Sequence, residues 1–562
     1  LFLSDSDSGV YIKQSNKVKG MIQHKSKILT FTLLAVCLMS INGVAMAANV
    51  PAGTILAEKQ ELVRNNGSEP ASLDPHKVES NVEFNLISDM FDGLVAVKSD
   101  GSIEPRLAAS WENKDNTVWT FHLRPGITWS DGSAITAQDV VWSWQRLVSP
   151  QTASPYSSYL GNMHVANALD IAQGKKDPAS IGVKALDDST LEITLTQPTA
   201  AFLAMLAHPS LVPLDKVLIG RFGDKWTRPE HFVCSGAYKL SQWVVNERIV
   251  AVRNPHYWDD RHTVIDKVTY LPISSESADV NRYKAGEIDI VYSVPVNQFA
   301  QLKKTMGDEL HVSPQLSTYY YQFNATRAPF NDPRVRRALN MALDKDIIAQ
   351  KVMGQGQRAA WVISQPEIGG VQLHAPEYAA WPLEKRITEA KKLLAEAGYG
   401  PEHPLSLNLL YNTFETHQRI AIAASSMWKK NLGVEAKLQN QEWKTMLDTM
   451  HTGNFDVVRY AWIADYDDAS SFLNIFRTGD SENTTRYSNP AFDDAMRKAA
   501  KATSLEERGK YYQQAEDLLG EDVPAIPVYH YVRTHLVKPW VGGFAPDNRG
   551  NYYTKDMFIK KH

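Results

Sequence analysis

Residues 455–468 bring a cation, an indole and a carboxylate close together at the end of an apolar run. The run is typical of a buried strand and leads into Arg459, Trp462 and Asp465. A buried strand rarely carries an unpaired charge, because a buried ion is costly unless another group compensates it. Arg459 therefore either has an internal partner, Asp456 or Asp465, or holds one end of a zwitterionic ligand whose other end meets Asp465.

The spacing of Arg459 and Asp465 limits how they can act on one ligand. Fully extended, residues 459–465 would span roughly 20 Å, whereas a tripeptide spans only about 10 Å at the same rise per residue. We therefore expect the chain to curl after Trp462, or the long side chain of Arg459 to reach back along the strand.

The local motifs of common enzyme classes are missing from the sequence. The 16 histidines are scattered, without a His-Glu-x-x-His pair or a Cys/His cluster of zinc spacing. We find no Gly-x-Ser-x-Gly elbow and no phosphate- or dinucleotide-binding glycine loop. Asp465, Asp467 and Asp468 do not have EF-hand spacing. The sequence thus offers no nucleophile, metal site or cofactor site for catalysis, and we expect the protein not to be an enzyme and to need no metal or cofactor. A secreted hydrolase or a chaperone-like holdase is the alternative from another class.

Residues 21–47 have the order of a cleavable secretory signal. A basic region at 24–27 precedes an apolar run at 28–39, and a small-x-small site ends at Ala47. The apolar run is too short for a stable membrane span. We expect cleavage after Ala47, and we expect residues 1–20 to be a non-native upstream extension.

Composition limits the partners and the domain count. About 515 residues would remain after cleavage, which predicts two or three domains. The formal net charge of −4 over 562 residues gives no reason to expect nucleic acid or an anionic membrane as partner. Cys234 would be the only remaining cysteine and is expected to be a small buried hydrophobe. Lipoprotein processing at Cys37 is a weaker alternative, because the branched Val36 precedes it.

Helical and strand patterns alternate irregularly, which predicts a mixed α/β protein. Val118 to Leu123 alternate with period two, as in a half-buried strand, and Thr136 has the pattern of an N-cap with Asp139 in the first turn. Asp332-Pro333 is expected to begin a helix that runs through Leu343.

The sequence before Arg459 predicts a helix-strand-helix-strand unit, of the kind that forms a sheet with a ligand crevice at its edge. A helix at 416–432 is followed by a strand at 434–438, a short helix from Trp443, and the strand after 455. In α/β sheets of this kind, ligands bind at the carboxyl ends of the strands. We therefore expect Arg459 to Asp465 at such an edge.

Residues 111–132 (WENKDNTVWTFHLRPGITWSDG) resemble the signature of the family 5 extracellular solute-binding proteins, which serve ABC importers of peptides and nickel. Segments 52–60, 244–249, 440–445 and 536–543 are similar to enterobacterial members that bind oligopeptides or murein peptides. The resemblance covers about residues 48–562.

The resemblance implies an α/β, two-lobed periplasmic binding protein of class C. Domain I would comprise 48–91, 216–317 and 533–562, domain II 92–215, and domain III 318–532. A monomer would enclose short peptides between its lobes and deliver them to an inner-membrane ABC permease. The peptide would add as a strand, while hinge motion closes the lobes. Murein tripeptide binding for cell-wall recycling is the alternative, and a nickel complex is a distant one.

The resemblance also implies roles for individual residues. Asp465 matches the carboxylate that pairs with the peptide α-ammonium, and Arg459 and His417 match residues that meet the carboxylate of longer peptides. Two backbone segments that flank the peptide and four pocket-wall residues complete the set: Glu79, Ser80 and Asn81; Ala461, Trp462 and Ile463; Trp443, Trp462, Tyr156 and Tyr292.

Several positions depart from the pattern of the family, among them Met450, Tyr460, Ser80 and Asn81. Ser317 and Ile463 stand where members can carry a cysteine pair, so that disulfide is not expected. Met353 replaces a lysine that can meet a dipeptide carboxylate, which argues against dipeptides as ligands.

Overall fold

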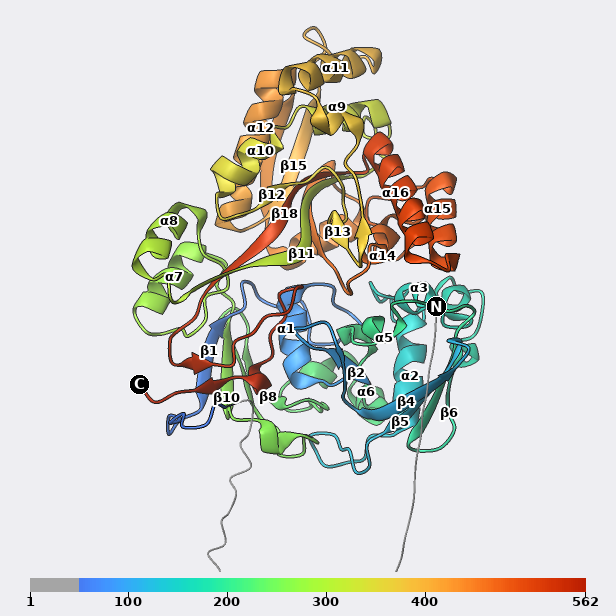
Figure 1. The fold of residues 1–562 in the computed structure, drawn as a ribbon, viewed down its shortest axis with the longest axis vertical. Coiled ribbons are helices and arrows are strands. Elements are labelled where there is room, and N and C mark those ends of the chain that lie inside the picture. The colour runs from blue at the N-terminus through green and yellow to red at the C-terminus, as the bar shows by residue number, and fades with distance from the viewer. Residues whose placement is uncertain (1–49) are drawn as a thin grey trace, which may run out of the picture. The chain divides into compact units, whose positions relative to one another are not determined.

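The computed structural model describes residues 50–562 (Figure 1). The predicted extension at 1–20, the predicted signal segment at 21–47 and its cleavage site after Ala47 lie outside the described residues. Within 50–562 the chain is a mixed α/β protein, as the alternating patterns predict.

Two four-stranded sheets come mainly from the first half of the chain. The first has the order β1-β10-β9-β8, with β1 parallel to β10. Its strands are β1 (Glu61–Asn65), β8 (Tyr238–Val244), β9 (Arg248–Arg253) and β10 (Lys267–Leu271). The second is antiparallel and has the order β4-β5-β7-β6. Its strands are β4 (Ala108–Lys114), β5 (Val118–Leu123), β6 (Val183–Ala185) and β7 (Thr190–Thr194).

Eight helices of the described chain accompany these sheets. They are α1 (Asn81–Met90), α2 (Ala137–Val148), α3 (Tyr159–Asn162), α4 (Ala168–Ala172), α5 (Phe202–Met205), α6 (Lys216–Phe222), α7 (Glu276–Lys284) and α8 (Val296–Thr305). The alternation predicted for β5 is confirmed, because Trp119, Phe121 and Leu123 are buried and their neighbours are less so. The predicted start of α2 is confirmed by a capping box, in which the backbone N–H of Thr136 donates to Asp139 at 2.8 Å.

A six-stranded sheet carries most of the second half. Its order is β12-β18-β11-β17-β15-β16. Its strands are β11 (Leu310–Phe323), β12 (Arg358–Ala359), β15 (Ser406–Asn412), β16 (Glu435–Gln441), β17 (Val457–Ile463) and β18 (Ala525–Leu536). β15 runs parallel to both β16 and β17. The helix-strand-helix-strand unit predicted before Arg459 is confirmed.

The helices of the second half include the predicted ones. They are α9 (Pro333–Met341), α10 (Lys345–Ile347), α11 (Leu383–Glu396), α12 (Glu415–Leu432), α13 (Trp443–Thr452), α14 (Ser470–Leu473), α15 (Pro490–Lys501) and α16 (Leu505–Asp522). The expected extent of α9 to Leu343 is wrong by two residues. Asp344 caps a new helix there by accepting from the backbone N–H of Ile347 at 3.1 Å.

Three two-stranded ribbons complete the described strands. They are β2 (Val95–Val97) with β3 (Ile103–Pro105), β13 (Glu367–Ile368) with β14 (Val371–Gln372), and β19 (Val541–Gly542) with β20 (Phe558–Ile559).

β11 and β18 are the long strands that run out of the six-stranded sheet toward the first one (Figure 1). At the far end of β18, Leu536 accepts from the backbone N–H of Val291, and Ile290 bridges both Val537 and Arg64 on β1. Their pairing is irregular between Pro314 and Thr318. The domain boundaries expected at 317/318 and 532/533 fall within these two strands, and the domain division itself stays a prediction.

Two further features bear on the sequence predictions. Cys234 is fully buried, and burial raises the pKa of its thiol to about 12, which suits a structural role. Among residues 50–562, no helix combines the length and the apolar character needed to cross a membrane.

We expect Phe121→Ala to lower the free energy of unfolding by about 3–5 kcal/mol, because a fully buried aromatic ring would leave a cavity between β5 and its neighbours. Urea unfolding followed by fluorescence would measure the loss. Leu186→Ala, at a side chain that is 55% exposed, is the matched control and should change stability by less than about 0.5 kcal/mol. A similar small loss for Phe121→Ala would contradict this packing.

Candidate ligand-binding pocket

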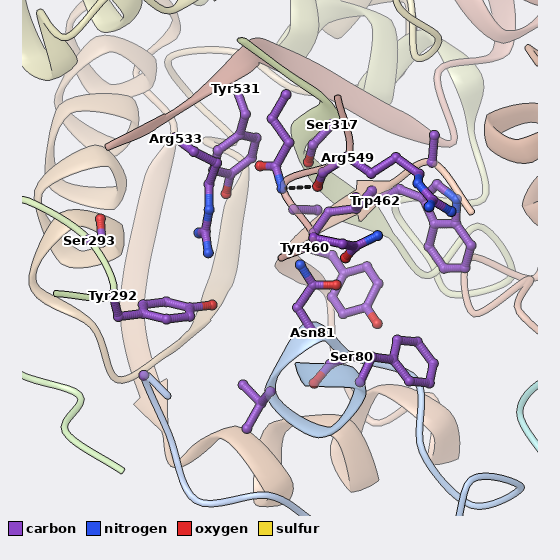
Figure 2. Close-up of a pocket in the computed structure, with 18 of the residues that line it drawn as sticks. Ser80, Asn81, Tyr292, Ser293, Ser317, Tyr460, Trp462, Tyr531, Arg533 and Arg549 are labelled. Carbon is purple, nitrogen blue, oxygen red and sulfur yellow. Dashed lines mark hydrogen bonds between the residues drawn. The ribbon is translucent and has the colours of Figure 1, made fainter. Parts of the chain in front are cut away.

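A cavity of about 210 Å³ lies where the end of β17 faces the start of α1. Residues from β11 and β18 and from the segments at 207–209 and 292–293 also line it (Figure 2). The structure brings all predicted site residues to this one cavity: Glu79, Ser80, Asn81, Tyr156, Tyr292, His417, Trp443, Arg459, Ala461, Trp462, Ile463 and Asp465. Their roles in ligand binding stay predictions. A larger space of about 1110 Å³, lined mainly by residues 161–205 and 466–512, contains none of them.

The end of β17 has one open edge. From Val457 to Ile463 the strand pairs with β11, but it pairs with β15 only at Val457 and Val458. From Arg459 onward, therefore, no strand of the described chain covers the second edge. The unpaired edge faces the cavity, because residues 459–465 all line it. An extended ligand can add to such an edge through main-chain hydrogen bonds.

The chain bends after β17, as the spacing of the two charges predicts. The strand ends at Ile463, and bends occupy residues 465–468. The backbone N–H of Asp465 donates to Ser471 Oγ at 2.7 Å, and its carbonyl accepts from Arg549 Nη1 at 2.7 Å. These two bonds hold the backbone of Asp465 in place.

Arg459 is buried without an anionic partner. Its guanidinium donates to Asn412 Oδ1 at 3.2 Å and to the Tyr531 hydroxyl at 2.6 Å, and it lies 4.7 Å from the centroid of the Tyr319 ring. Among residues 50–562, no carboxylate oxygen lies within 4.0 Å of it. The alternative that Arg459 is neutralised by Asp456 or Asp465 is therefore wrong.

The two candidate partners of Arg459 are occupied elsewhere. Asp456 accepts from Asn408, at 3.1 Å from the backbone N–H and 2.8 Å from Nδ2, and lies 3.4 Å from Arg327. Asp465 Oδ1 accepts from the Tyr156 hydroxyl at 3.3 Å and lies 3.4 Å from His208 Nε2. Asp465 thus meets groups from the first half of the chain.

His417 lies beside Arg459 as a neutral imidazole. Burial lowers its pKa well below the ordinary value, and the charge of Arg459 lowers it further. Its Nδ1 is buried without a hydrogen-bond partner in the described chain. Arg459 and His417 together make a cationic, donor-rich end of the cavity, which suits a carboxylate.

The start of α1 faces β17 across the cavity (Figure 2). Ser80 is the N-cap residue, and its hydroxyl donates to the Glu83 carboxylate, whose pKa burial raises to about 7. Just before it, Glu79 accepts from His451 Nε2 at 2.8 and 2.9 Å. This pair joins the start of α1 to α13.

Several lining residues were not predicted from the sequence. Trp443 and the unpredicted Tyr460 stack with ring centroids 6.2 Å apart. Arg533 lies 4.7 Å from the centroid of the Tyr292 ring, and Figure 2 shows both side chains reaching into the cavity. His208, Tyr531, Arg533 and Arg549 stand far from Asp465 in sequence and carry no local motif. Only their tertiary placement identifies them.

The departures from the family pattern lie at the same site. Ser317 and Ile463 are directly opposite each other on β11 and β17, so no disulfide can join these strands there. Met353 lines the cavity and brings no charge to it. No group of three or more histidine, cysteine, aspartate or glutamate side chains in the described chain could hold a metal ion.

Comparison with known proteins matches this chain to bacterial solute-binding proteins, both by family model and by individual relatives. Residues 102–484 match the model of the bacterial extracellular solute-binding proteins, family 5. The chain is 54% identical over 521 residues to the periplasmic oligopeptide-binding protein OppA of Escherichia coli, covering 92% of this chain and 96% of the relative.

Solved structures of two relatives are similar to this one. OppA of Haemophilus influenzae in complex with the peptide RPPGFSPFR has a TM-score of 0.89 at 45% identity, covering 90% of this chain and all of that chain. The murein tripeptide-binding protein MppA of E. coli also gives 0.89, at 44% identity and with 91% and 100% covered. Its unliganded open form gives only 0.63 at the same identity, with 91% and 99% covered.

The Glu79–His451 pair gives a testable prediction for the pKa of His451. Burial disfavours the charged imidazole, but hydrogen bonds and charge from Glu79 outweigh it, so the pKa of His451 lies above its ordinary 6.5. The pair therefore stabilises this contact fully below about pH 6.5, and the stabilisation is lost as the pH rises through the raised pKa. We expect Glu79→Gln to lower the pKa of His451, measured by NMR titration of the imidazole.

Glu61→Gln, an exposed carboxylate on β1, is the control for that titration and should leave the His451 pKa unchanged. An unaltered His451 pKa in Glu79→Gln would show that the contact does not exist in solution.

Proposed function

Because the chain belongs to the family 5 bacterial extracellular solute-binding proteins, we propose that it captures short oligopeptides and delivers them to an ABC permease. Members of this family are solute-binding proteins, not enzymes. We extend that to this chain, which would bind peptides and release them intact. The lining of the cavity by Arg459 and Asp465 supports this cavity as the proposed binding site.

The observation that carries this proposal is the pair of opposite charges that the fold keeps apart. Arg459 has no carboxylate within 4.0 Å in the part of the chain that the structure describes. Asp465 faces the same cavity against Tyr156 and His208. A zwitterionic peptide complements both, because its ammonium suits Asp465 and its carboxylate suits Arg459 beside His417.

The open edge of β17 supports peptides over other zwitterions. Main-chain hydrogen bonds to Ala461 and Ile463 would hold any sequence equally, since they use only groups that every residue has. Aromatic walls, among them Trp443, Trp462 and Tyr292, would contact the side chains. We propose broad sequence tolerance on this ground.

The periplasm is the proposed compartment. The relatives OppA and MppA are periplasmic proteins, and residues 21–47 would direct export with cleavage after Ala47. The three-domain division, with boundaries inside β11 and β18, is part of the same proposal. The second candidate ligand is a murein tripeptide, favoured by the similarity to MppA. The higher identity to OppA favours general oligopeptides.

We expect Asp465→Asn to weaken binding of a free tripeptide by about 1–3 kcal/mol, because the buried ammonium would lose its charged partner. Isothermal titration calorimetry would measure the loss. Asp467→Asn is the matched control, since that exposed carboxylate accepts from Gly369 at 3.0 Å outside the cavity. An N-acetylated tripeptide, which has no ammonium, should bind weakly to the wild type and to Asp465→Asn alike. Equal affinity of the free peptide for wild type and Asp465→Asn would refute ammonium capture.

Mass spectrometry of ligand released by gentle denaturation of the purified protein tests the proposed function directly. We expect a mixture of short peptides of different sequence. A single species that contains diaminopimelate would instead establish the murein peptide as ligand. Cleaved products formed from an added peptide would show a hydrolase.

A further inference from the structure

A second cavity, of about 1110 Å³, lies apart from the proposed peptide cavity. One side of it is formed mainly by residues 161–170 and 196–205, and the other by residues 466–512, which include α14, α15 and α16. No residue lines both cavities. Pockets for small molecules usually have volumes of about 300–1,000 Å³, so the second cavity is large enough for a ligand of its own.

The side of the second cavity that comes from the first half of the chain offers an apolar wall. Trp119 on β5 and Phe202 on α5 both line it, with ring centroids 5.0 Å apart. Leu169 on α4 also lines it and is 40% exposed, so this part of the wall is accessible to a ligand. Leu203 and Met205 extend the wall. An apolar group that leaves water for this surface would be stabilised by the hydrophobic effect.

The opposite side of the second cavity carries an excess of positive charge. Two acidic residues line the cavity, Asp170 and Asp468, against four basic ones: Arg477, Arg497, Lys501 and Arg508. Both carboxylates are already engaged. Asp170 is paired with Lys176 at 2.9 Å, and Asp468 accepts from the Tyr512 hydroxyl at 2.6 Å and lies 3.7 Å from Arg508 Nε. The charge that remains available in the cavity is therefore positive.

Arg477 is the lining cation that most clearly lacks an anion. Its Nη1 donates to Asn162 Oδ1 at 2.9 Å, and its Nε is buried without a hydrogen-bond partner in the described chain. Among residues 50–562, no carboxylate oxygen lies within 4.0 Å of its guanidinium. Arg508 Nε is likewise buried without a hydrogen bond. A buried donor without an acceptor is costly, so an anion with oxygen acceptors would stabilise these groups.

His164 lines the same cavity and supplies no countercharge to Arg477. Burial lowers the pKa of the His164 imidazole to about 4, and the positive charge of Arg477 lowers it further. The imidazole Nδ1 lies 2.8 Å from the Thr199 hydroxyl. A neutral histidine beside Arg477 leaves the guanidinium as the centre of positive charge in this part of the cavity.

We propose that the second cavity binds an anionic amphiphile, a small molecule with one carboxylate on an apolar body. The carboxylate would accept from Arg477, and Arg508 and Lys501 would add to the positive potential around it. The apolar body would lie against the wall that contains Trp119 and Leu169. This site would be additional to the proposed peptide site, and it does not depend on the proposed function.

Calorimetry with decanoate in the presence of saturating trialanine tests the second cavity. Decylammonium, with the same chain length and the opposite charge, is the matched control ligand. Because the two cavities share no lining residue, we expect decanoate to bind the trialanine-saturated wild type. Decylammonium should bind at least roughly tenfold more weakly, since it would meet unpaired cations. Arg477→Gln should weaken the binding of decanoate by roughly tenfold, the strength of one charge-assisted hydrogen bond.

Two further variants separate binding in the second cavity from general effects on the protein. Leu169→Ser should weaken the binding of decanoate, because the apolar body would lose part of its wall. The same variant should leave the affinity for trialanine unchanged, since Leu169 does not line the peptide cavity. Arg261→Gln, at an arginine whose side chain is 76% exposed, is the control and should bind decanoate as wild type does.

The inference fails if decanoate does not bind, if trialanine displaces it, if decylammonium binds as tightly, or if Arg477→Gln and Arg261→Gln bind decanoate equally well. In each of these cases the proposed function stands, because trialanine titrated alone judges it separately. If trialanine does not bind, the proposed function fails. Decanoate titrated into ligand-free wild type and Arg477→Gln then still decides the inference.

Discussion

Arg459 is buried at the cavity among a hydroxyl, an amide oxygen and an aromatic ring instead of against a carboxylate. Removing one partner from a buried ion pair is strongly destabilising, because the remaining charge is left without compensation. Here Asn412, Tyr531 and Tyr319 compensate part of that cost. Asp465 is held in a comparable way by Tyr156 and His208. Both groups are preorganised, so little reorganisation would accompany binding.

Keeping these charges apart depends on the sheet that carries β17. β11 pairs with one edge of β17 over its full length, whereas β15 pairs with the other edge only as far as Val458. The bend after Ile463 then turns Asp465 toward Tyr156 and His208. The cavity lies between distant parts of the chain, because β17 and the bend after it supply Arg459 and Asp465, whereas Tyr156 and His208 come from the first half.

Contacts across the cavity come from both halves of the chain. His451 meets Glu79, and Ser158 and Ser481 exchange hydrogen bonds at 3.1 and 2.9 Å. The structure also is more similar to the peptide complex of a relative, with a TM-score of 0.89, than to an unliganded open relative, with 0.63. These contacts therefore belong to an arrangement that is similar to that of the relative's peptide complex.

The sequence by itself determined the local elements. The period of Val118 to Leu123, the capping box at Thr136 and the alternation leading to Arg459 depend on neighbouring residues and are visible in one dimension. The twelve residues that the family resemblance names all line one cavity, and their roles in ligand binding stay predictions. Tertiary structure alone decided the partners of Arg459, because Asn412 and Tyr531 lie 47 and 72 positions away. It also decided that Asp465 meets Tyr156 and His208, since contacts between distant residues depend on how every element packs.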